Sequence, residues 1–327
     1  MITGKSITIL RPAHSQSRTG NGVTAERWLA ILQSLGARVE IKTAYDGSPS
    51  DLLIAIHAWR SADGIAQFAS AHSRKPIVVC LSGTDIYAFQ ASHPDATLAS
   101  MQTATALVGL HDLVGRSIPE RFRSKLHIIY QSAPALVRRP PVQETFDVCV
   151  VGHLRAEKDP FRAAAAARLL PAHSKIRILH AGSAPDKHWT ARALAENAEN
   201  PRYHWLGGVD ETAVRDVLTS CRLMVLSSTM EGGANVLSEA IAAGLPVLSS
   251  DIDGSVGLLG RDYPGYFNVG DTEQLARLLG RTESDAIFLA ELTARCVALA
   301  PRFTVDRERR SWSQLLAVIG LVAGRAA

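Results

Sequence analysis

Short apolar runs alternate with stretches of helical periodicity along the first part of the chain. Between the first two runs, Val23–Leu35 places apolar residues at helical spacing, and Gly36 is positioned to end that helix. Such alternation predicts a parallel, doubly wound α/β sheet. The runs that predict its strands are Ser6–Leu10, Val39–Lys42, Leu52–Ile56, Ile77–Leu81, Ala106–Gly109 and Leu126–Tyr130.

A proline-containing segment, Val137–Thr145, interrupts this pattern. Arg138 and Arg139 precede Pro140 and Pro141 there, and two prolines break regular structure, so we predict a linker.

The strand and helix pattern then restarts. We predict a first domain over residues 1–140, a second over 141–305 and a C-terminal helical segment over 306–327 that could return to the first domain. The predicted elements are strands at Phe146–Val151, Lys175–Ala181, Leu223–Leu226 and Val247–Ser249, helices at Asp159–Leu170 and Asn235–Ala243, and one or two helices over Asp306–Val322.

Length and charge agree with this division and narrow the choice of ligand. The 327 residues suit two α/β domains, and 46% hydrophobic with 20% charged residues indicates a packed globular protein. The formal net charge is +4 with scattered Lys and Arg, which favours anionic small molecules such as nucleotides. We find no nucleic-acid-binding motif and expect no nucleic-acid partner.

The cysteines and the apolar stretches bear on the cellular compartment. No two of the four cysteines form a Cys-x-x-Cys pair, and Cys80 and Cys149 lie in apolar runs, so we expect free buried thiols. No secretory leader and no apolar stretch of membrane-spanning length is evident. We therefore expect a cytoplasmic protein without stable membrane insertion.

Two glutamates with seven residues between them, Glu231 and Glu239, mark the most informative segment. A strand ends just before it, and a helix is predicted to begin within it, so its glycines and the helix N-terminus suit a diphosphate. Besides the glutamates, the donor contacts we expect are Gly232, Gly233, Asn235 and Val236.

Each glutamate has a predicted role in this segment. The Glu239 carboxylate can accept hydrogen bonds from both hydroxyls of a ribose, and Glu231 could meet a sugar hydroxyl. The competing interpretation is a plain strand–loop–helix unit with two surface glutamates. We favour the ligand site, because a glutamate within a helix of small residues calls for a polar partner.

A second segment offers positive charge after the first strand of the second half. Gly152 frees the backbone at that strand's carboxyl end, where ligands gather in open α/β sheets. Arg155 and Lys158 could stabilise the charge on a departing diphosphate, as a divalent metal does elsewhere. The alternative is that both cations are solvated and pair with Glu157 and Asp159.

These two segments resemble the family-4-like retaining glycosyltransferases of GT-B fold, whose patterns run Gly-x-Leu-x-x-Glu-Lys-Gly and Glu-x7-Glu. The resemblance implies two doubly wound Rossmann-like domains facing a central cleft. It also implies that Arg155 and Lys158 hold the diphosphate, that Glu231 faces the donor sugar, and that Glu239 binds the ribose.

The chain departs from that family at several positions. His153 stands where arginine is frequent, and Asp159 stands where glycine is frequent. The turn Gln131-Ser132-Ala133 replaces the usual Asn-Gly, so we expect an unusual acceptor half.

The whole chain resembles a narrower group, the selenosugar synthases of selenoneine biosynthesis. The segments that carry this resemblance are Arg11-Pro12-Ala13, Gly20-Asn21-Gly22 to Trp28, His57-Ala58-Trp59-Arg60, and Leu81 to Tyr87. The resemblance implies transfer of a sugar from UDP-glucose or UDP-N-acetylglucosamine to selenophosphate, forming a carbon–selenium bond. A sugar, thiol or other small-molecule acceptor, a UDP-sugar epimerase or hydrolase, and a non-catalytic nucleotide-sugar sensor remain as alternatives.

On the acceptor side, Gly20, Asn21 and Gly22 precede the helix predicted from Val23. A glycine loop that opens onto a helix N-terminus suits an anion, although a flexible turn explains the same residues.

Two strand ends in the first half offer further chemistry. His57 ends one buried strand and Asp85 follows another, and we predict both as catalytic residues. Arg60 and Thr84 are predicted acceptor or anion contacts. The alternatives are a satisfied core histidine, a solvated arginine and an Asx-type cap.

One pair of carboxylates has a spacing that can bind metal, Asp251 and Asp253. It opens a glycine-rich segment, so we predict a turn there. We expect an enzyme that needs no metal ion or cofactor and whose partners are its small-molecule substrates.

Overall fold

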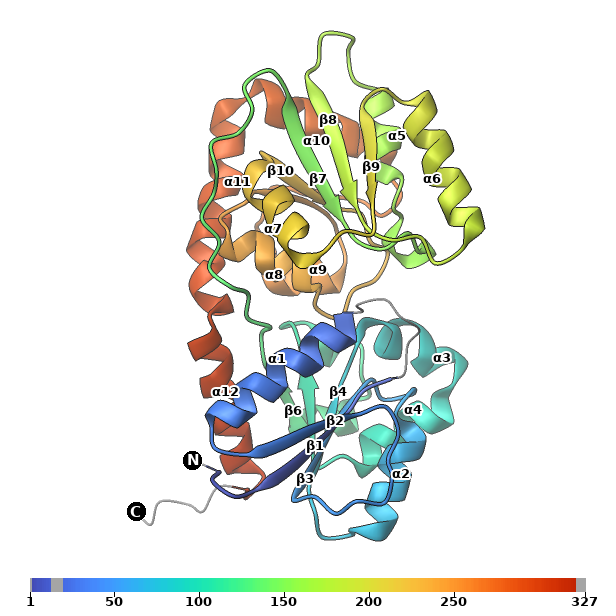
Figure 1. The fold of residues 1–327 in the computed structure, drawn as a ribbon, viewed down its shortest axis with the longest axis vertical. Helices are drawn as coiled ribbons and strands as arrows, with labels where there is room; N and C mark the ends of the chain where they lie inside the picture. The colour runs from blue at the N-terminus through green and yellow to red at the C-terminus, as the bar shows by residue number, and fades with distance from the viewer. Residues whose placement is uncertain (1, 13–19, 322–327) are drawn as a thin grey trace. The chain divides into compact units, whose positions relative to one another are not determined.

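The computed structural model describes residues 2–12 and 20–321. The chain forms two compact units (Figure 1). Unit 1 comprises Met1–Ser132, Glu231–Gly233 and Val305–Ala327, and unit 2 comprises Ala133–Met230 and Ala234–Thr304. Ala13 of the Arg11-Pro12-Ala13 segment lies outside the described residues.

Unit 1 contains a six-stranded sheet in the order β2-β1-β3-β4-β5-β6, and every neighbouring pair is parallel. The chain runs outward from β1 to β2 and then continues on the other side of β1, so the order reverses between β1 and β3. The strands are β1 (Ser6–Leu10), β2 (Arg38–Lys42), β3 (Leu52–Ile56), β4 (Ile77–Cys80), β5 (Ala106–Gly109) and β6 (Leu126–Ile128).

Helices cover both faces of this sheet because the buried side chains of its strands alternate in direction. Leu52, Ile54 and Ile56 of β3 share a core with α1 and α12, whereas Leu53 and Ala55 share one with α2 and α4. The helical elements are α1 (Gly20–Ser34), α2 (Ala62–Ala71), the π-helix η1 (Asp85–Phe89), α3 (Gln90–Ser92), α4 (Pro94–Thr103), η2 (Val114–Arg116), η3 (Glu120–Lys125) and α12 (Val305–Val318).

Unit 2 contains a second six-stranded parallel sheet, in the order β12-β11-β10-β7-β8-β9. This is the dinucleotide-binding type of strand order, which reverses between β7 and β10. The strands are β7 (Phe146–Val151), β8 (Ile176–Ala181), β9 (Tyr203–Gly207), β10 (Leu223–Leu226), β11 (Val247–Ser250) and β12 (Tyr266–Phe267).

The helices of unit 2 flank this sheet, and α5 packs against α10 while α8 packs against α11. They are η4 (Ala156–Lys158), α5 (Arg162–Arg168), α6 (Lys187–Glu199), α7 (Glu211–Ser220), α8 (Asn235–Ala242), α9 (Asp253–Leu259), α10 (Thr272–Ser284), α11 (Ala286–Leu299) and η5 (Ala300–Phe303).

The structure confirms the doubly wound architecture and corrects three local predictions. Helix α1 begins at Gly20, so the three residues Gly20 to Gly22 form its first turn and not a loop before it. Helix α5 begins at Arg162 and not at Asp159, because Asp159 adopts a left-handed conformation (φ +43°) that no α-helix continues. The segment from Asp253 is the helix α9 and not a turn.

The predicted helix end at Gly36 agrees with the structure, and Gly244 ends α8 in the same way. Gly36 and Gly244 have φ values of +98° and +63°, the left-handed conformation that ends a helix after α1 and α8. The amide of Leu245 then bonds the carbonyl of Ala240 at 2.9 Å, which closes the end of α8.

The structure also bears on the predictions about the cysteines and about membrane-spanning segments. All four cysteines are buried and free, as predicted. Within the described residues, no helix combines the length and the apolar character that crossing a membrane requires.

Candidate donor and acceptor sites

The residues of the Gly152–Lys158 segment lie at the reversal point of the sheet in unit 2. Gly152 directly follows β7 and Ser227 directly follows β10, the two strands between which the order reverses. In open α/β sheets, ligands bind in the crevice outside the carboxyl ends of such strands. The fold of unit 2 therefore makes this point its expected ligand site.

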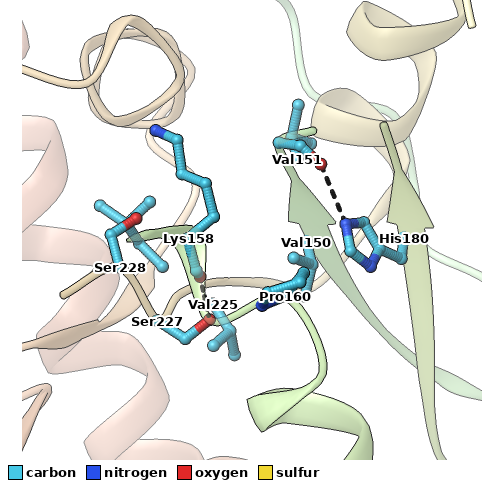
Figure 2. A pocket seen from close by; sticks show the side chains of 10 residues that line it. Val150, Val151, Lys158, Pro160, His180, Val225, Ser227 and Ser228 are labelled. Atoms are coloured by element: carbon cyan, nitrogen blue, oxygen red, sulfur yellow. Dashed lines mark hydrogen bonds between the residues drawn. The ribbon is translucent and has the colours of Figure 1, made fainter. Parts of the chain in front are cut away.

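A small pocket marks this point (Figure 2). Figure 2 shows Lys158 and Ser227 on one side of it and His180 on the other, with the Lys158 nitrogen directed away from Ser227. The lining residues are Val150, Val151, Gly152, Lys158, Pro160, His180, Val225, Leu226, Ser227 and Ser228.

The backbone around Lys158 is held by the segment that follows β10. The Ser227 hydroxyl lies 3.1 Å from the Lys158 carbonyl oxygen and 2.9 Å from that of Asp159, and donates to them. The amide of Thr229 donates to the Glu157 carbonyl at 2.8 Å. The Asp159 carboxylate pairs with Arg162 at 2.7 Å, so this acid is engaged by a cation further along the chain.

The loop that begins at Gly152 is also docked on the end of β8. The amide of Gly152 donates to Ala181 at 2.9 Å, and the amide of Leu154 donates to the Ser183 carbonyl at 3.0 Å. A Cβ on Gly182 would lie 1.8 Å from the Gly152 carbonyl oxygen, so only glycine allows this approach. The loop that carries Arg155 and Lys158 is therefore fixed at both of its ends.

The two glutamates of the Glu-x7-Glu segment fall in different units. Glu239 is half-buried in the second turn of α8, and the N-cap residue Ala234 supplies no capping side chain. Glu231 is buried and belongs with Gly232 and Gly233 to unit 1. Within that unit, a Cβ on Gly83 would lie 2.5 Å from the amide nitrogen of Gly232, so the two backbones meet without side chains.

His57 contacts both Thr84 and Asp85 in unit 1. His57 Nδ1 contacts the Asp85 carboxylate, and His57 Nε2 lies 2.9 Å from the Thr84 hydroxyl. His57 directly follows β3, at the reversal point of this sheet, with a φ of +78° that few side chains adopt. Backbone strain of this kind clusters at functional sites.

The Asp85 carboxylate also accepts hydrogen bonds from backbone amides. The amides of Ala58 and Ser82 donate to it at 2.9 Å each, and the amide of Trp59 donates at 3.2 Å. His57 and Asp85 are only 1% and 0% exposed. Thr84, which is half-buried, is more accessible than either of these side chains.

Arg60 is exposed beside a cluster of rings at the same end of the sheet. The indole of Trp59 stacks on Phe89 with ring centres 4.1 Å apart, and the Arg60 guanidinium lies 5.5 Å from the Phe89 ring centre. A hollow adjoins this cluster, lined by Pro12, Trp59, Arg60, Ala62, Asp63 and Ala96.

The glycine segment at the start of α1 does not form the predicted loop. The Thr24 hydroxyl bonds the Gly20 carbonyl at 2.9 Å, and the Gln131 amide group donates to that hydroxyl at 2.6 Å. These contacts hold the first turn of α1 in place despite its glycines. Asn21 extends toward Ser82, whose hydroxyl lies 3.3 Å from the Asn21 side-chain oxygen.

Sequence reasoning did not single out His180 or Ser227 as site residues. His180 is an ionisable side chain that faces the core within the mostly apolar strand β8, and that is the signal by which it could have been found. Ser227 carries no comparable signal, since its contacts depend on the fold. Among residues 2–12 and 20–321, no three His, Cys, Asp or Glu side chains gather as a metal site requires.

Comparison with known proteins identifies the second half of the chain. The family model described as "Glycosyl transferases group 1" matches residues 137–300, half of the chain. No curated protein matches the chain in sequence.

Solved structures resemble both halves together. HepE from Anabaena in complex with UDP is 16% identical, with a TM-score of 0.79 over 96% of this chain and 100% of that chain. Sucrose-phosphate synthase from Thermosynechococcus elongatus is 14% identical, with a TM-score of 0.78 over 96% and 99%. The α,α-trehalose 6-phosphate synthase of Burkholderia multivorans is 13% identical, with a TM-score of 0.72 over 99% and 100%. With the two parallel sheets, this likeness confirms the predicted GT-B fold class.

Proposed function

The chain belongs to the group 1 glycosyl transferases, and on that premise we propose that it moves a sugar from a UDP-sugar to selenophosphate without a metal ion. The donor is UDP-glucose or UDP-N-acetylglucosamine, and the product is a selenosugar with a carbon–selenium bond. The observation that carries the donor half is the position of Gly152, Lys158 and Ser227 at the reversal point of a dinucleotide-binding type of sheet.

Unit 2 supplies the leaving-group side of this reaction. As the bond between the sugar C1 and the diphosphate oxygen breaks, UDP leaves with the electron pair and negative charge grows on the β-phosphate. Arg155 and Lys158 offset that charge, and a preorganised cation acts most strongly on charge that develops in the transition state. The Glu239 carboxylate accepts hydrogen bonds from the ribose hydroxyls. HepE, whose structures hold UDP and UDP-glucose, supports a uridine nucleotide as the donor.

Unit 1 supplies the acceptor side in this proposal. Arg60 attracts the anionic acceptor, and the Thr84 hydroxyl, held by His57 and Asp85, gives it a fixed hydrogen-bonding contact. Selenium forms the new bond to C1 with its own electron pair. The nucleophile is already anionic and polarizable, so His57 and Asp85 act as positioning residues for Thr84. Glu231 faces the donor sugar.

Two sequence features support selenophosphate over a sugar or lipid acceptor. The first is the resemblance of the segments around Trp28, His57 and Tyr87 to selenosugar synthases. The second is the replacement of the usual Asn-Gly turn by Gln131 and Ser132, both of which are buried and bonded within unit 1.

Product analysis tests both halves of the proposal. The purified protein is incubated in EDTA with UDP-glucose or UDP-N-acetylglucosamine, with and without selenophosphate, and the products are identified by mass spectrometry. We expect a sugar that carries the selenium isotope pattern, together with free UDP. Donor cleavage or epimerisation without a selenium-containing product would contradict the acceptor half. Failure of the folded protein to bind or consume either UDP-sugar would contradict the donor half.

A further inference from the structure

His180 is a buried histidine whose two ring nitrogens are both engaged. Its Nε2 lies 3.0 Å from the Gly152 carbonyl oxygen, and its Nδ1 lies 2.9 Å from the Tyr203 hydroxyl. A carbonyl oxygen only accepts hydrogen bonds, so Nε2 carries the proton and donates. Nδ1 then accepts from Tyr203. The two contacts together select a single neutral tautomer.

The ring is also uncharged at neutral pH. His180 is 0% exposed, and this burial lowers the pKa of its imidazole to about 4. Near pH 7 the residue therefore brings no positive charge to the pocket that it lines. Its contribution to ligand binding must come from the bond that it makes to the loop.

The hydrogen bond from His180 orients the Gly152 carbonyl group at the edge of the pocket. Gly152 and Lys158 line the same pocket, and a carbonyl oxygen directed into it would repel a phosphate. His180 bonds this oxygen on the side of β8 instead, where Gly182 leaves room for it. Figure 2 shows His180 on the opposite side of the pocket from Lys158.

We propose that His180 is a positioning residue for nucleotide phosphate binding. By donating to the Gly152 carbonyl, it holds the loop that carries Arg155 and Lys158 in the conformation that receives a diphosphate. Tyr203 assists by fixing the tautomer. The inference rests on the proposed function, because it takes a nucleoside diphosphate as the ligand of this pocket.

The proposal predicts different effects on a ligand that carries phosphates and on a nucleoside that carries none. UDP should lose affinity when the His180 donor is removed, whereas uridine, which carries no phosphate, should not. A merely structural role would weaken both ligands or neither.

Three substitutions test this difference. His180→Gln places an amide N–H near the position of Nε2, whereas the shorter His180→Asn does not reach Gly152. Tyr203→Phe removes only the hydroxyl bond to Nδ1. Calorimetry measures the affinity for UDP, NMR titration measures the weaker affinity for uridine, and circular dichroism verifies that each variant folds.

We expect His180→Asn to weaken UDP binding about tenfold and His180→Gln less than about threefold, the scale of one hydrogen bond. Uridine affinity should change less than about twofold in all three variants, and Tyr203→Phe should lie between the other two for UDP. In turnover, His180→Asn should raise the KM for the UDP-sugar more than it lowers kcat.

The result that overturns the inference is equal UDP affinity in His180→Asn, His180→Gln and the unchanged protein. A parallel loss of uridine and UDP affinity would equally overturn it, since the effect would then not concern the phosphates. If the unchanged, folded protein binds no UDP, the proposed function fails and the inference fails with it.

Discussion

The carboxylate of Glu308 on α12 accepts a hydrogen bond of 2.7 Å from the indole nitrogen of Trp28 on α1. Glu308 is 1% exposed, and it also accepts from the amide and the hydroxyl of Ser132 at 2.8 and 2.5 Å. Arg27 completes the set with an ion pair at 3.2 Å. One buried acid thus joins α12 to α1 and to the end of the segment after β6.

Removing this acid should destabilise unit 1 strongly. Glu308→Ala leaves a buried indole N–H, a backbone amide and a guanidinium without their acceptor, and we expect a loss of about 3–5 kcal/mol. Urea-induced unfolding measures this loss in the free energy of unfolding. Glu291→Ala, which removes an exposed acid paired with Arg295 at 3.9 Å, is the matched control and should change stability by less than about 1 kcal/mol. Equal effects of the two substitutions would contradict this account.

The low pKa of His180 predicts a pH dependence of stability. The unfolded chain binds a proton at His180 with the ordinary imidazole pKa of about 6.5, whereas burial lowers this pKa to about 4 in the folded chain. The unfolded state therefore holds more protons between these values, and stability falls as the pH falls from 6.5 to 4. At pH 5 the loss from this residue is about 2 kcal/mol.

Unfolding at pH 7 and pH 5 tests this dependence when the unchanged protein is compared with His180→Gln. Other groups titrate in both proteins and largely cancel in the difference. His180→Gln should lose less stability on acidification than the unchanged protein. Identical pH profiles would show that His180 does not titrate as its burial requires.

A pair of glycines provides a steric test of the loop that carries Arg155 and Lys158. A Cβ on Gly182 would lie 1.8 Å from the Gly152 carbonyl oxygen, so Gly182→Ala must displace the loop. We expect UDP affinity to fall at least about tenfold, because the cations lose their positions. At Gly280, within α10, the nearest atom to a Cβ is 3.8 Å away. Gly280→Ala should leave UDP affinity unchanged and stabilise the protein by about 0.5–1 kcal/mol. Unchanged UDP affinity in Gly182→Ala would contradict the docking of the loop.

In the proposed mechanism, His57 and Asp85 act on the acceptor through the Thr84 hydroxyl. Thr84→Val keeps the shape but removes the hydroxyl, and we expect kcat/KM for selenophosphate to fall about tenfold with donor affinity unchanged. Steady-state kinetics with each substrate varied in turn measures this, and Thr84→Ser should restore most of the rate. A loss of activity as deep as that of Lys158→Ala would contradict the view that the acceptor needs little help from a base.

The sequence sufficed for the fold wherever strands were continuous apolar runs. Strands β1, β3, β5, β7 and β10 have the predicted bounds because both faces of a parallel sheet are buried. Strand β9 was missed because Tyr203–Gly207 is mostly half-buried and mixes polar with aromatic residues. Strand β12, with two residues, carries no periodicity at all.

The places of candidate site residues in the fold were predictable where the residues follow an apolar strand, and not where they depend on tertiary contacts. Gly152 and Lys158 follow from their place after an apolar strand. The first turn of α1 does not, because the partner that holds Thr24 is Gln131, more than one hundred residues away. The contacts of Glu308 were missed for the same reason, since the sequence of a helix rich in charged residues does not indicate that one of its acids is buried.

Calorimetric titration of UDP into the protein in the presence of EDTA tests directly whether this pocket binds a nucleoside diphosphate. We expect binding with a dissociation constant on the order of 10–100 µM, and a loss of affinity of about a hundredfold in Lys158→Ala. Lys187→Ala, at an exposed lysine at the start of α6, should bind UDP as the unchanged protein does. No heat of binding from the folded protein, or equal affinity in Lys158→Ala, would contradict the claim that this pocket holds a nucleoside diphosphate by cations of the protein.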